Sequence, residues 1–188
     1  MEYDGVSWRL IEVPNRSVRA LAVDDPGTIY VGGENEIGYL APDAYGTLRY
    51  VSLIDYITDD KKNFSSVWYT YSHPEGIYFM TSKYLFRWDP ASRHLKTWEP
   101  SYFFTSAFMC SGTLYVRQKK VGLMQMKKDT LRLVTGGETF ANENVEMLVP
   151  YDTRTLLIGT RTKGFFLDDG TACKPFPTQA DAYLAEKT

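Results

Sequence analysis

The sequence predicts an all-β protein, and three observations support that prediction. Short apolar runs follow one another along the chain and are separated by turn residues, as in Asp25-Pro26-Gly27 and Asp168-Asp169-Gly170. No window of useful length shows the period of 3.6 residues that an amphipathic helix requires. The apolar runs also recur in a repeated order, which predicts a series of similar antiparallel sheets.

The repeat is clearest in the runs anchored by Ile29, Ile77, Leu114 and Leu156, which lie 48, 37 and 42 residues apart. This spacing is close to the ~40 to 45 residues of a four-stranded propeller blade. One apolar run precedes each anchor run and two follow it, so each repeat supplies four strands. We therefore expect a β-propeller of four-stranded antiparallel blades, here an incomplete arc of about four blades.

Turn-rich segments divide this single propeller fragment into six parts. We expect the outer strand of a preceding blade at 1–14, blades at 15–54, 63–99, 102–135 and 144–176, and the lead-in to a missing blade at 177–188. Because terminal blades of an open arc would expose apolar faces, we also expect the fragment to self-associate.

The pair Gly32-Gly33 allows two interpretations. A phosphate-binding loop needs a following helix whose N–H groups face the anion, but Ile37 to Leu40 reads as a strand. The glycines are therefore expected to supply unusual backbone angles at a hairpin bend between the second and third strands.

The composition excludes several classes of function. The 21 basic and 23 acidic residues give a net charge of −2, so no nucleic-acid partner is expected. No apolar stretch reaches the roughly 20 residues of a membrane helix, and Met1 does not begin a recognisable signal peptide, so we expect no membrane contact by this segment. Cys110 and Cys173 lack metal-ligand spacing and are read as buried thiols, with a disulfide as the alternative. No metal or cofactor is expected.

Catalysis is not indicated either. His73 and His94, the only histidines, lie in turn-like contexts, and no Gly-x-Ser-x-Gly motif is present. The acidic pairs Asp24-Asp25 and Asp168-Asp169 lack the alternating ligands of a calcium loop and are typical of turns. We therefore expect that the chain is not an enzyme.

The pattern V-x-x-(L/I)-x-x-D-x-x-G-x-(L/I)-(W/Y)-(V/I)-G resembles the two-component regulator propeller repeat. Met80 and Arg117 depart from it by replacing the glycine after the second strand, and Ser72 and Ser111 stand nearest to the missing aspartate. The matching residues are Val18, Leu21, Asp24, Gly27, Ile29, Tyr30, Val31, Gly32 and Gly38 in the first repeat, and Val145, Leu148, Leu156, Ile158, Gly159, Thr160 and Gly164 in the fourth.

This resemblance implies a periplasmic sensor domain of a bacterial hybrid two-component receptor. The parent protein would then carry a histidine kinase or another output module that this chain does not include.

Candidate ligand-binding residues lie on loops around one mouth of the predicted channel and on the innermost strands. The polar candidates can also be solvated loop residues, and the aromatic ones can stack on sugar rings or pack in the core. The candidates are Glu34, Asn35, Glu36, Trp68, Tyr71, Arg117, Asn144, Arg161 and Lys163.

We therefore interpret the chain as a non-catalytic sensor fragment that binds a small molecule or an oligosaccharide, such as a glycan-derived compound. A propeller that serves as a protein–protein interaction scaffold is the alternative. A propeller-type lyase or hydrolase is the third and least favoured interpretation.

Overall fold

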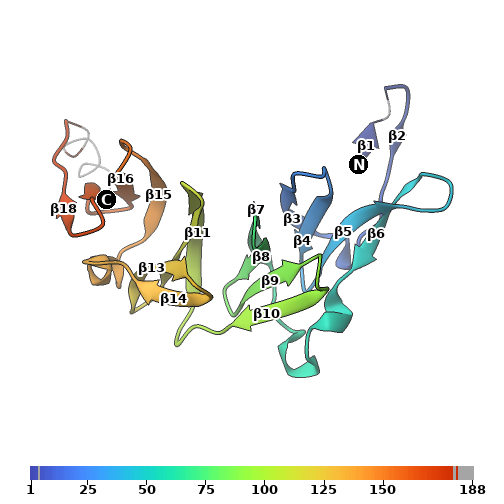
Figure 1. The fold of residues 1–188 in the computed structure, drawn as a ribbon, viewed down its shortest axis with the longest axis horizontal. Helices are drawn as coiled ribbons and strands as arrows, with labels where there is room; N and C mark the ends of the chain where they lie inside the picture. Colours follow the sequence, from blue (N-terminus) through green and yellow to red (C-terminus); the bar gives the residue numbers. More distant parts are fainter. Residues whose placement is uncertain (4, 180, 182–188) are drawn as a thin grey trace. The chain divides into compact units, whose positions relative to one another are not determined.

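A computed structural model describes residues 1–3, 5–179 and 181, which form strands, turns and short 3-10 helices (Figure 1). The 3-10 helices are η1 (Pro14–Arg16), η2 (Ile54–Tyr56), η3 (Asp59–Lys61) and η4 (Gly137–Phe140). The strands of the first two large sheets are β3 (Val18–Val23), β4 (Ile29–Gly33), β5 (Ile37–Pro42), β6 (Leu48–Ser52), β7 (Val67–His73), β8 (Gly76–Thr81), β9 (Leu85–Asp89) and β10 (His94–Trp98).

The next two large sheets contain β11 (Phe104–Cys110), β12 (Thr113–Gln118), β13 (Gly122–Lys127), β14 (Thr130–Leu133), β15 (Val145–Pro150), β16 (Leu156–Thr160), β17 (Phe165–Asp168) and β18 (Cys173–Pro175). Within each of the four sheets, the four strands are antiparallel and lie in chain order. The all-β prediction and the four-stranded sheets are therefore confirmed.

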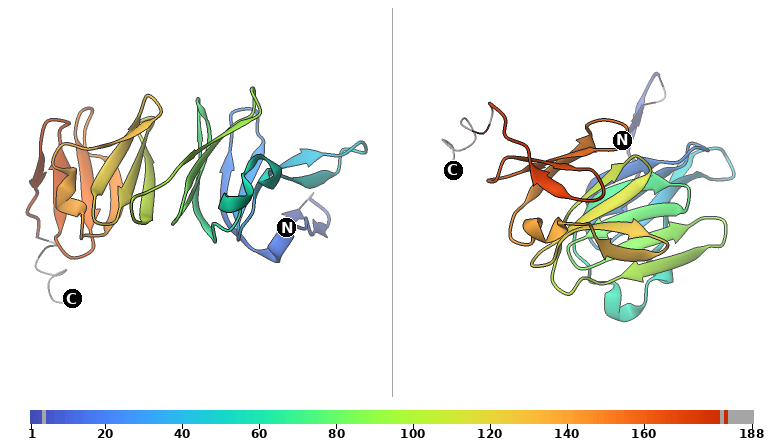
Figure 2. Two further views of the ribbon diagram at one scale, coloured as in Figure 1. Left: turned by 90° about the horizontal axis from the view of Figure 1, so that it is seen from below. Right: turned by 60° about the vertical axis from the view of Figure 1, so that its left-hand side comes forward.

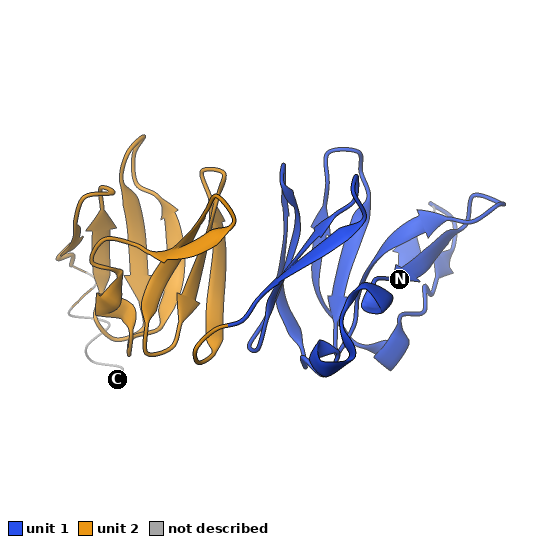
Figure 3. Cartoon of the chain, turned by 60° about the horizontal axis from the view of Figure 1, so that its bottom comes forward, with its two compact units in different colours: residues 1–99 blue, residues 100–188 orange. Residues whose placement is uncertain are grey.

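The chain consists of two compact units, residues 1–99 and residues 100–188 (Figure 3). Unit 1 contains the sheets β3–β6 and β7–β10, and unit 2 contains β11–β14 and β15–β18. Inside each unit, the first strands of the two sheets are neighbours: β3 lies beside β7, and β11 lies beside β15 (Figure 2).

Each unit buries an apolar core between its two sheets. In unit 1 the core includes Tyr30 and Ile37 from the first sheet and Phe86 from the second. In unit 2 it includes Phe140 and Phe166, whose ring centroids lie 5.2 Å apart at an interplanar angle of 79°. Edge-to-face pairs of this kind add to the stabilisation that burial provides.

The first strand of every large sheet carries a β-bulge at the same place. The register shifts between Val18 and Ala20 in β3, and correspondingly between Val67/Tyr69, Phe104/Ser106 and Val145/Met147. The extra residues are Arg19, Trp68, Thr105 and Glu146, and all four are exposed. Since a bulge leaves one residue out of the ladder, each sheet presents one side chain that pairing does not constrain.

Gly32 and Gly33 lie within β4 and have ordinary backbone angles, so their predicted role at the bend was wrong. The left-handed residue of this hairpin is Asn35, with φ 49°. Gly32 is instead required by close packing, because a Cβ there would lie 2.5 Å from Cγ1 of Val67.

The first 14 residues are described except residue 4, whereas at the other end the description stops at residues 179 and 181. Residues 1–14 contain a small hairpin of β1 (Glu2–Tyr3) and β2 (Trp8–Arg9). Their assignment to a preceding blade stays a prediction, as does the lead-in at 177–188, of which 180 and 182–188 lie outside the described residues. Cys110 and Cys173 are both free thiols. No helix among the described residues has the length and apolar character needed to cross a membrane.

Candidate functional site

Each large sheet has two ends, which differ in the connections between strands that they carry. At the loop end, the loop between the second and third strands lies near the segment that leads into a first strand. At the turn end, the first strand turns into the second and the third into the fourth. Among the predicted ligand-binding residues only Tyr71 lies away from the loop end, in the second half of β7.

In unit 1, Glu34 and Asn35 join the first sheet to the segment that precedes β7. The Asn35 amide nitrogen donates to the Ser65 carbonyl at 2.9 Å, and its Oδ1 accepts from the Ser65 amide at 2.6 Å. The Glu34 carboxylate accepts from the hydroxyls of Ser65 and Ser66. These two predicted residues therefore fasten neighbouring sheets together.

Glu36 is buried and faces its own sheet. Its Oε1 accepts hydrogen bonds from the Tyr50 hydroxyl at 2.9 Å and from the Ser52 hydroxyl at 2.5 Å. Burial, together with the Glu36 carboxylate, raises the pKa of Tyr50, so the phenol keeps its proton and the bond persists at neutral pH.

The two predicted aromatic residues differ in exposure. The side chain of Trp68, the bulged residue of β7, is 51% exposed, and the Arg19 guanidinium lies over its ring at 5.1 Å from the centroid. Tyr71 is half-buried and stacks with Tyr69 at a centroid distance of 6.3 Å. Burial raises the pKa of Tyr71 to about 12.

In unit 2, Arg117 was predicted to lie on a loop, but it belongs to β12, which extends through Gln118. The side chain of Arg117 is buried. Its guanidinium donates to the carbonyls of Phe140 at 3.0 Å and Ala141 at 2.8 Å, to Oγ1 of Thr105 and to Oδ1 of Asn144. Burial lowers the pKa of Arg117 below its ordinary value. Arg117 and Asn144 thus link the two sheets of unit 2.

Arg161 and Lys163 remain on the surface. Arg161 Nε contacts Glu146 Oε1 at 2.9 Å, and the Arg161 amide donates to the Asn144 carbonyl at 3.0 Å. Beside them, Glu143 is buried and accepts from the amide and the hydroxyl of Thr162. These bonds hold the pKa of Glu143 below its ordinary value although burial opposes ionisation.

The loop end therefore serves mainly to connect sheets. Of the nine predicted residues, the structure leaves the side chains of Trp68, Arg161 and Lys163 exposed. Their role in ligand binding stays a prediction.

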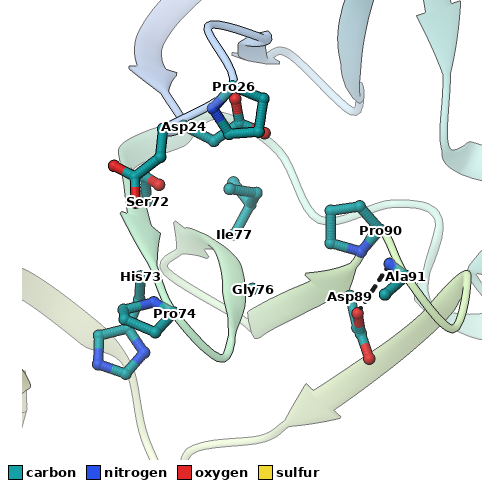
Figure 4. A pocket seen from close by; sticks show the side chains of 11 residues that line it. Asp24, Pro26, Ser72, His73, Pro74, Gly76, Ile77, Asp89, Pro90 and Ala91 are labelled. Carbon is teal, nitrogen blue, oxygen red and sulfur yellow. Dashed lines mark hydrogen bonds between the residues drawn. The ribbon is translucent and has the colours of Figure 1, made fainter.

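The turn end of unit 1 contains a pocket of about 500 Å³ (Figure 4). Three turns surround it: β3–β4, β7–β8 and β9–β10. Figure 4 shows Ile77 between Asp24 and Ser72 on one side and Pro90 on the other. The polar lining residues are Asp24, Asp25, Ser72, His73 and Asp89.

The pocket carries negative charge at neutral pH. Asp24 Oδ1 accepts from the Thr28 amide at 2.7 Å. The Ser92 hydroxyl bonds to Asp89 at 2.5 Å and holds the pKa of that carboxyl below its usual range. Burial and the nearby Asp24 raise the pKa of Tyr30 to about 12, so the adjoining phenol stays neutral. The site therefore offers carboxylate acceptors to a ligand that brings hydroxyl or amine donors.

Unit 2 has a smaller pocket of about 200 Å³ at its own turn end. Its polar lining residues are Ser111, Tyr115, Gln125, Thr135, Asp152, Thr153, Arg154, Thr155 and Asp168. Asp168 is buried, and burial raises the pKa of its carboxyl. Neither pocket was predicted from the sequence, because aspartates in such positions are typical of turns. Their recurrence at equivalent turns is the signal that could have identified the pockets.

Solved structures that resemble this chain share its fold of four-stranded blades. The chain aligns with the extracellular domain of the putative hybrid two-component system BT4673 from B. thetaiotaomicron, at 17% identity and a TM-score of 0.59 over 88% of this chain and 23% of that one. The corresponding domain of BT3049 from the same organism aligns at 12% identity and a TM-score of 0.62, over 86% of this chain and 24% of that one.

An enzyme shares the same fold. Virginiamycin B lyase from Staphylococcus aureus aligns at 13% identity and a TM-score of 0.55, over 90% of this chain and 59% of that one. No family model and no curated protein sequence matches the chain. The chain spans about a quarter of the length of the two extracellular domains. These likenesses establish four-stranded propeller blades as the fold, while the activity must be argued from the site.

Proposed function

We propose that this chain is part of the sensor propeller of a bacterial signalling receptor, and that it binds a ligand without transforming it. The observation that carries the proposal is the turn-end pocket of unit 1, in a fold shared with extracellular domains of putative two-component systems. In the parent receptor, the propeller would lie outside the cytoplasm. Ligand binding would then bias the state of a histidine kinase or another output module.

The lining of the pocket suits a small polyhydroxylated ligand, such as a glycan-derived compound. Three prolines, Pro26, Pro74 and Pro90, and the side chain of Ile77 offer apolar surface to the C–H face of a sugar ring. The carboxylates of Asp24, Asp25 and Asp89 can accept hydrogen bonds from its hydroxyl groups. An amino sugar would gain a charge-assisted bond as well.

Isothermal titration calorimetry with a panel of neutral and amino-substituted di- and trisaccharides tests this proposal. For a sugar that binds, Asp25→Asn is expected to weaken affinity by about tenfold, because a carboxylate acceptor is worth more than an amide. Lys163→Ala, at the loop end of unit 2, is the matched surface control and should leave affinity unchanged.

Two results would contradict the proposal. One is the absence of binding by every sugar at millimolar concentration. The other is binding that Trp68→Ala or Lys163→Ala weakens and Asp25→Asn does not, which would move the site to the loop end.

A further inference from the structure

The first strand of the chain's first large sheet exposes an apolar row. Val18, Leu21 and Val23 of β3 are 50%, 59% and 58% exposed. The alternating residues Ala20 and Ala22 lie on the opposite face, where Ala20 packs against the core of unit 1. One face of β3 is therefore packed against β7–β10, and the other presents aliphatic side chains to solvent.

The repeat shows what normally covers this row. By strand register, Val18 and Leu21 correspond to Val67 and Thr70 in β7, and to Val145 and Leu148 in β15. Val67 and Thr70 are 0% and 7% exposed, and Val145 and Leu148 are 2% and 5% exposed. In both cases the row lies against the preceding sheet of the same unit. The β3 row is thus one half of a sheet-to-sheet contact that occurs twice inside the molecule.

The matching half is found on the chain's last sheet. The face of β15–β18 that points away from the unit 2 core is formed by side chains that are half-buried or exposed: Met147, Val149, Leu157, Phe165 and Leu167. These positions correspond to those through which β3–β6 covers β7, and Gly159 corresponds to Gly32, the glycine against which Val67 and Thr70 pack.

The bulged residues add charge complementarity to this match. Within unit 1, the bulged residue of one sheet lies against that of the next, as Arg19 does over Trp68. A sheet that followed β15–β18 in the same manner would bring its bulged residue beside Glu146, which is exposed and whose Oε1 contacts Arg161 Nε of the same sheet at 2.9 Å. If that sheet is β3–β6 of another molecule, its bulged residue is Arg19, of the opposite charge.

We propose that the chain associates head to tail with a second copy of itself, the β3–β6 face of one copy packing on the face of β15–β18 that points away from the unit 2 core of the other. Such a contact joins two different surfaces, so two copies can close on each other or further copies can add. Arg19 of one copy pairs with Glu146 of the next. This association concerns the chain of 188 residues by itself, because neighbouring blades would occupy the same two faces in a larger propeller. It does not depend on the ligand-binding role proposed above.

Sedimentation equilibrium of the full chain over a micromolar concentration series tests the proposal. The mass is expected to rise above the monomer value of 21.5 kDa as concentration increases. Leu21→Lys should abolish the rise, because it places a charge at the centre of the apolar row. The matched control is Tyr45→Lys, at a residue that is 94% exposed in the β5–β6 turn, and it should leave association unchanged.

Charge reversal tests the orientation of the contact. Arg19→Glu and Glu146→Arg should each weaken association by about tenfold or more, since each brings like charges together. An equimolar mixture of the two variants should associate again, because every mixed contact then pairs opposite charges. Circular dichroism melting curves would verify that both variants are folded.

Three results would overturn the proposal. If the wild-type chain stays monomeric throughout the series, a second copy of the chain does not cover this apolar row. Association that is insensitive to Leu21→Lys places the contact elsewhere. Single charge reversals that weaken association without recovery in the mixture rule out the pairing of Arg19 with Glu146.

Discussion

Unit 1 and unit 2 join their sheets differently at the same backbone position. In β4 this position is Gly32, and its lack of a side chain lets Val67 and Thr70 of β7 approach closely. In β12 the position is Arg117, whose side chain fills the joint and bonds to the carbonyls of Phe140 and Ala141. Each residue lies opposite the residue that follows the bulge of its first strand.

The difference shows that the propeller repeat fixes a position and leaves the means of connection open. An apolar joint gains dispersion contacts and has no polar group to satisfy at this residue. A polar joint must satisfy the donors of a buried cation, and the Arg117 guanidinium donates to four acceptors around it. The two units should consequently differ in which substitutions they tolerate.

The largest effect is expected from Gly32→Leu. The new side chain would overlap Val67 and Thr70, whose strand β7 is held in place by its pairing with β8. We therefore expect the free energy of unfolding to fall by more than about 4 kcal/mol and unit 1 to unfold. Gly159→Leu is the matched control, because its nearest neighbours are the side chains of Met147 and Phe165, at 3.2 to 3.4 Å, which can move. Chemical denaturation followed by tryptophan fluorescence measures the effect of Gly32→Leu, since Trp8, Trp68, Trp88 and Trp98 all lie in unit 1. Far-ultraviolet circular dichroism, which also reports unit 2, measures the control.

A loss of about 3 kcal/mol is expected from Arg117→Ala, because it leaves two buried carbonyls and Asn144 without their donor. Arg161→Ala, which removes an exposed ion pair, should cost less than about 1 kcal/mol. Far-ultraviolet circular dichroism should report the change while tryptophan fluorescence does not. If both signals shift together, the two units unfold as one, and the comparison between them fails.

A gain of about 1 kcal/mol is expected from Thr70→Val. Thr70 Oγ1 is buried without a hydrogen-bond partner among the described residues, and the corresponding residue of unit 2 is the apolar Leu148. The substitution removes an unsatisfied hydroxyl and keeps the shape of the side chain. Thermal unfolding measures the gain, and a decrease in stability would show that the hydroxyl has a partner in solution.

The smallest effect concerns alkaline pH. Burial, aided by Asp168, raises the pKa of Cys173 in unit 2 from 9.0 to about 12. Burial likewise raises the pKa of Tyr30 and Tyr71 in unit 1 from 10.0 to about 12. A raised pKa contributes stability that is present below the unfolded value and is lost as pH rises toward the folded value.

The melting temperature of unit 2 should therefore begin to fall above about pH 9, and that of unit 1 above about pH 10. Circular dichroism and tryptophan fluorescence, recorded together from pH 8 to 11, would separate the two. Cys173→Ala should remove the earlier onset. A common onset in the wild-type protein would contradict this assignment.

Much of the fold could be predicted because its signals are local. The apolar runs Val18–Val23 and Phe104–Cys110 are β3 and β11, and the Asp, Gly and Pro residues that separate the runs form turns. The four bulges could not be predicted, since Arg19, Trp68, Thr105 and Glu146 share no chemical property that marks an unpaired residue.

The candidate site was harder to predict than the fold. A charged residue beside a turn usually points to solvent, which led to the expectation for Arg117. The end of η4 instead supplies the carbonyls of Phe140 and Ala141, and the side chain of Arg117 is buried. The pockets arise where turns that are distant in sequence come together, as Asp24, Ser72 and Asp89 do, and no local pattern encodes that proximity.

The recurrent bulge also bears on how such a protein can change. Arg19, Trp68, Thr105 and Glu146 are a cation, an aromatic ring, a hydroxyl and an anion, at one equivalent place in four sheets. Because the ladder does not use these residues, Arg19, Trp68 and Glu146 can be replaced at little cost in folding free energy, whereas Thr105 also accepts a hydrogen bond from the buried Arg117. Mutation can therefore vary surface positions that the strand pairing leaves open, and the repeat that makes the architecture uniform also supplies equivalent places at which new binding properties can be selected.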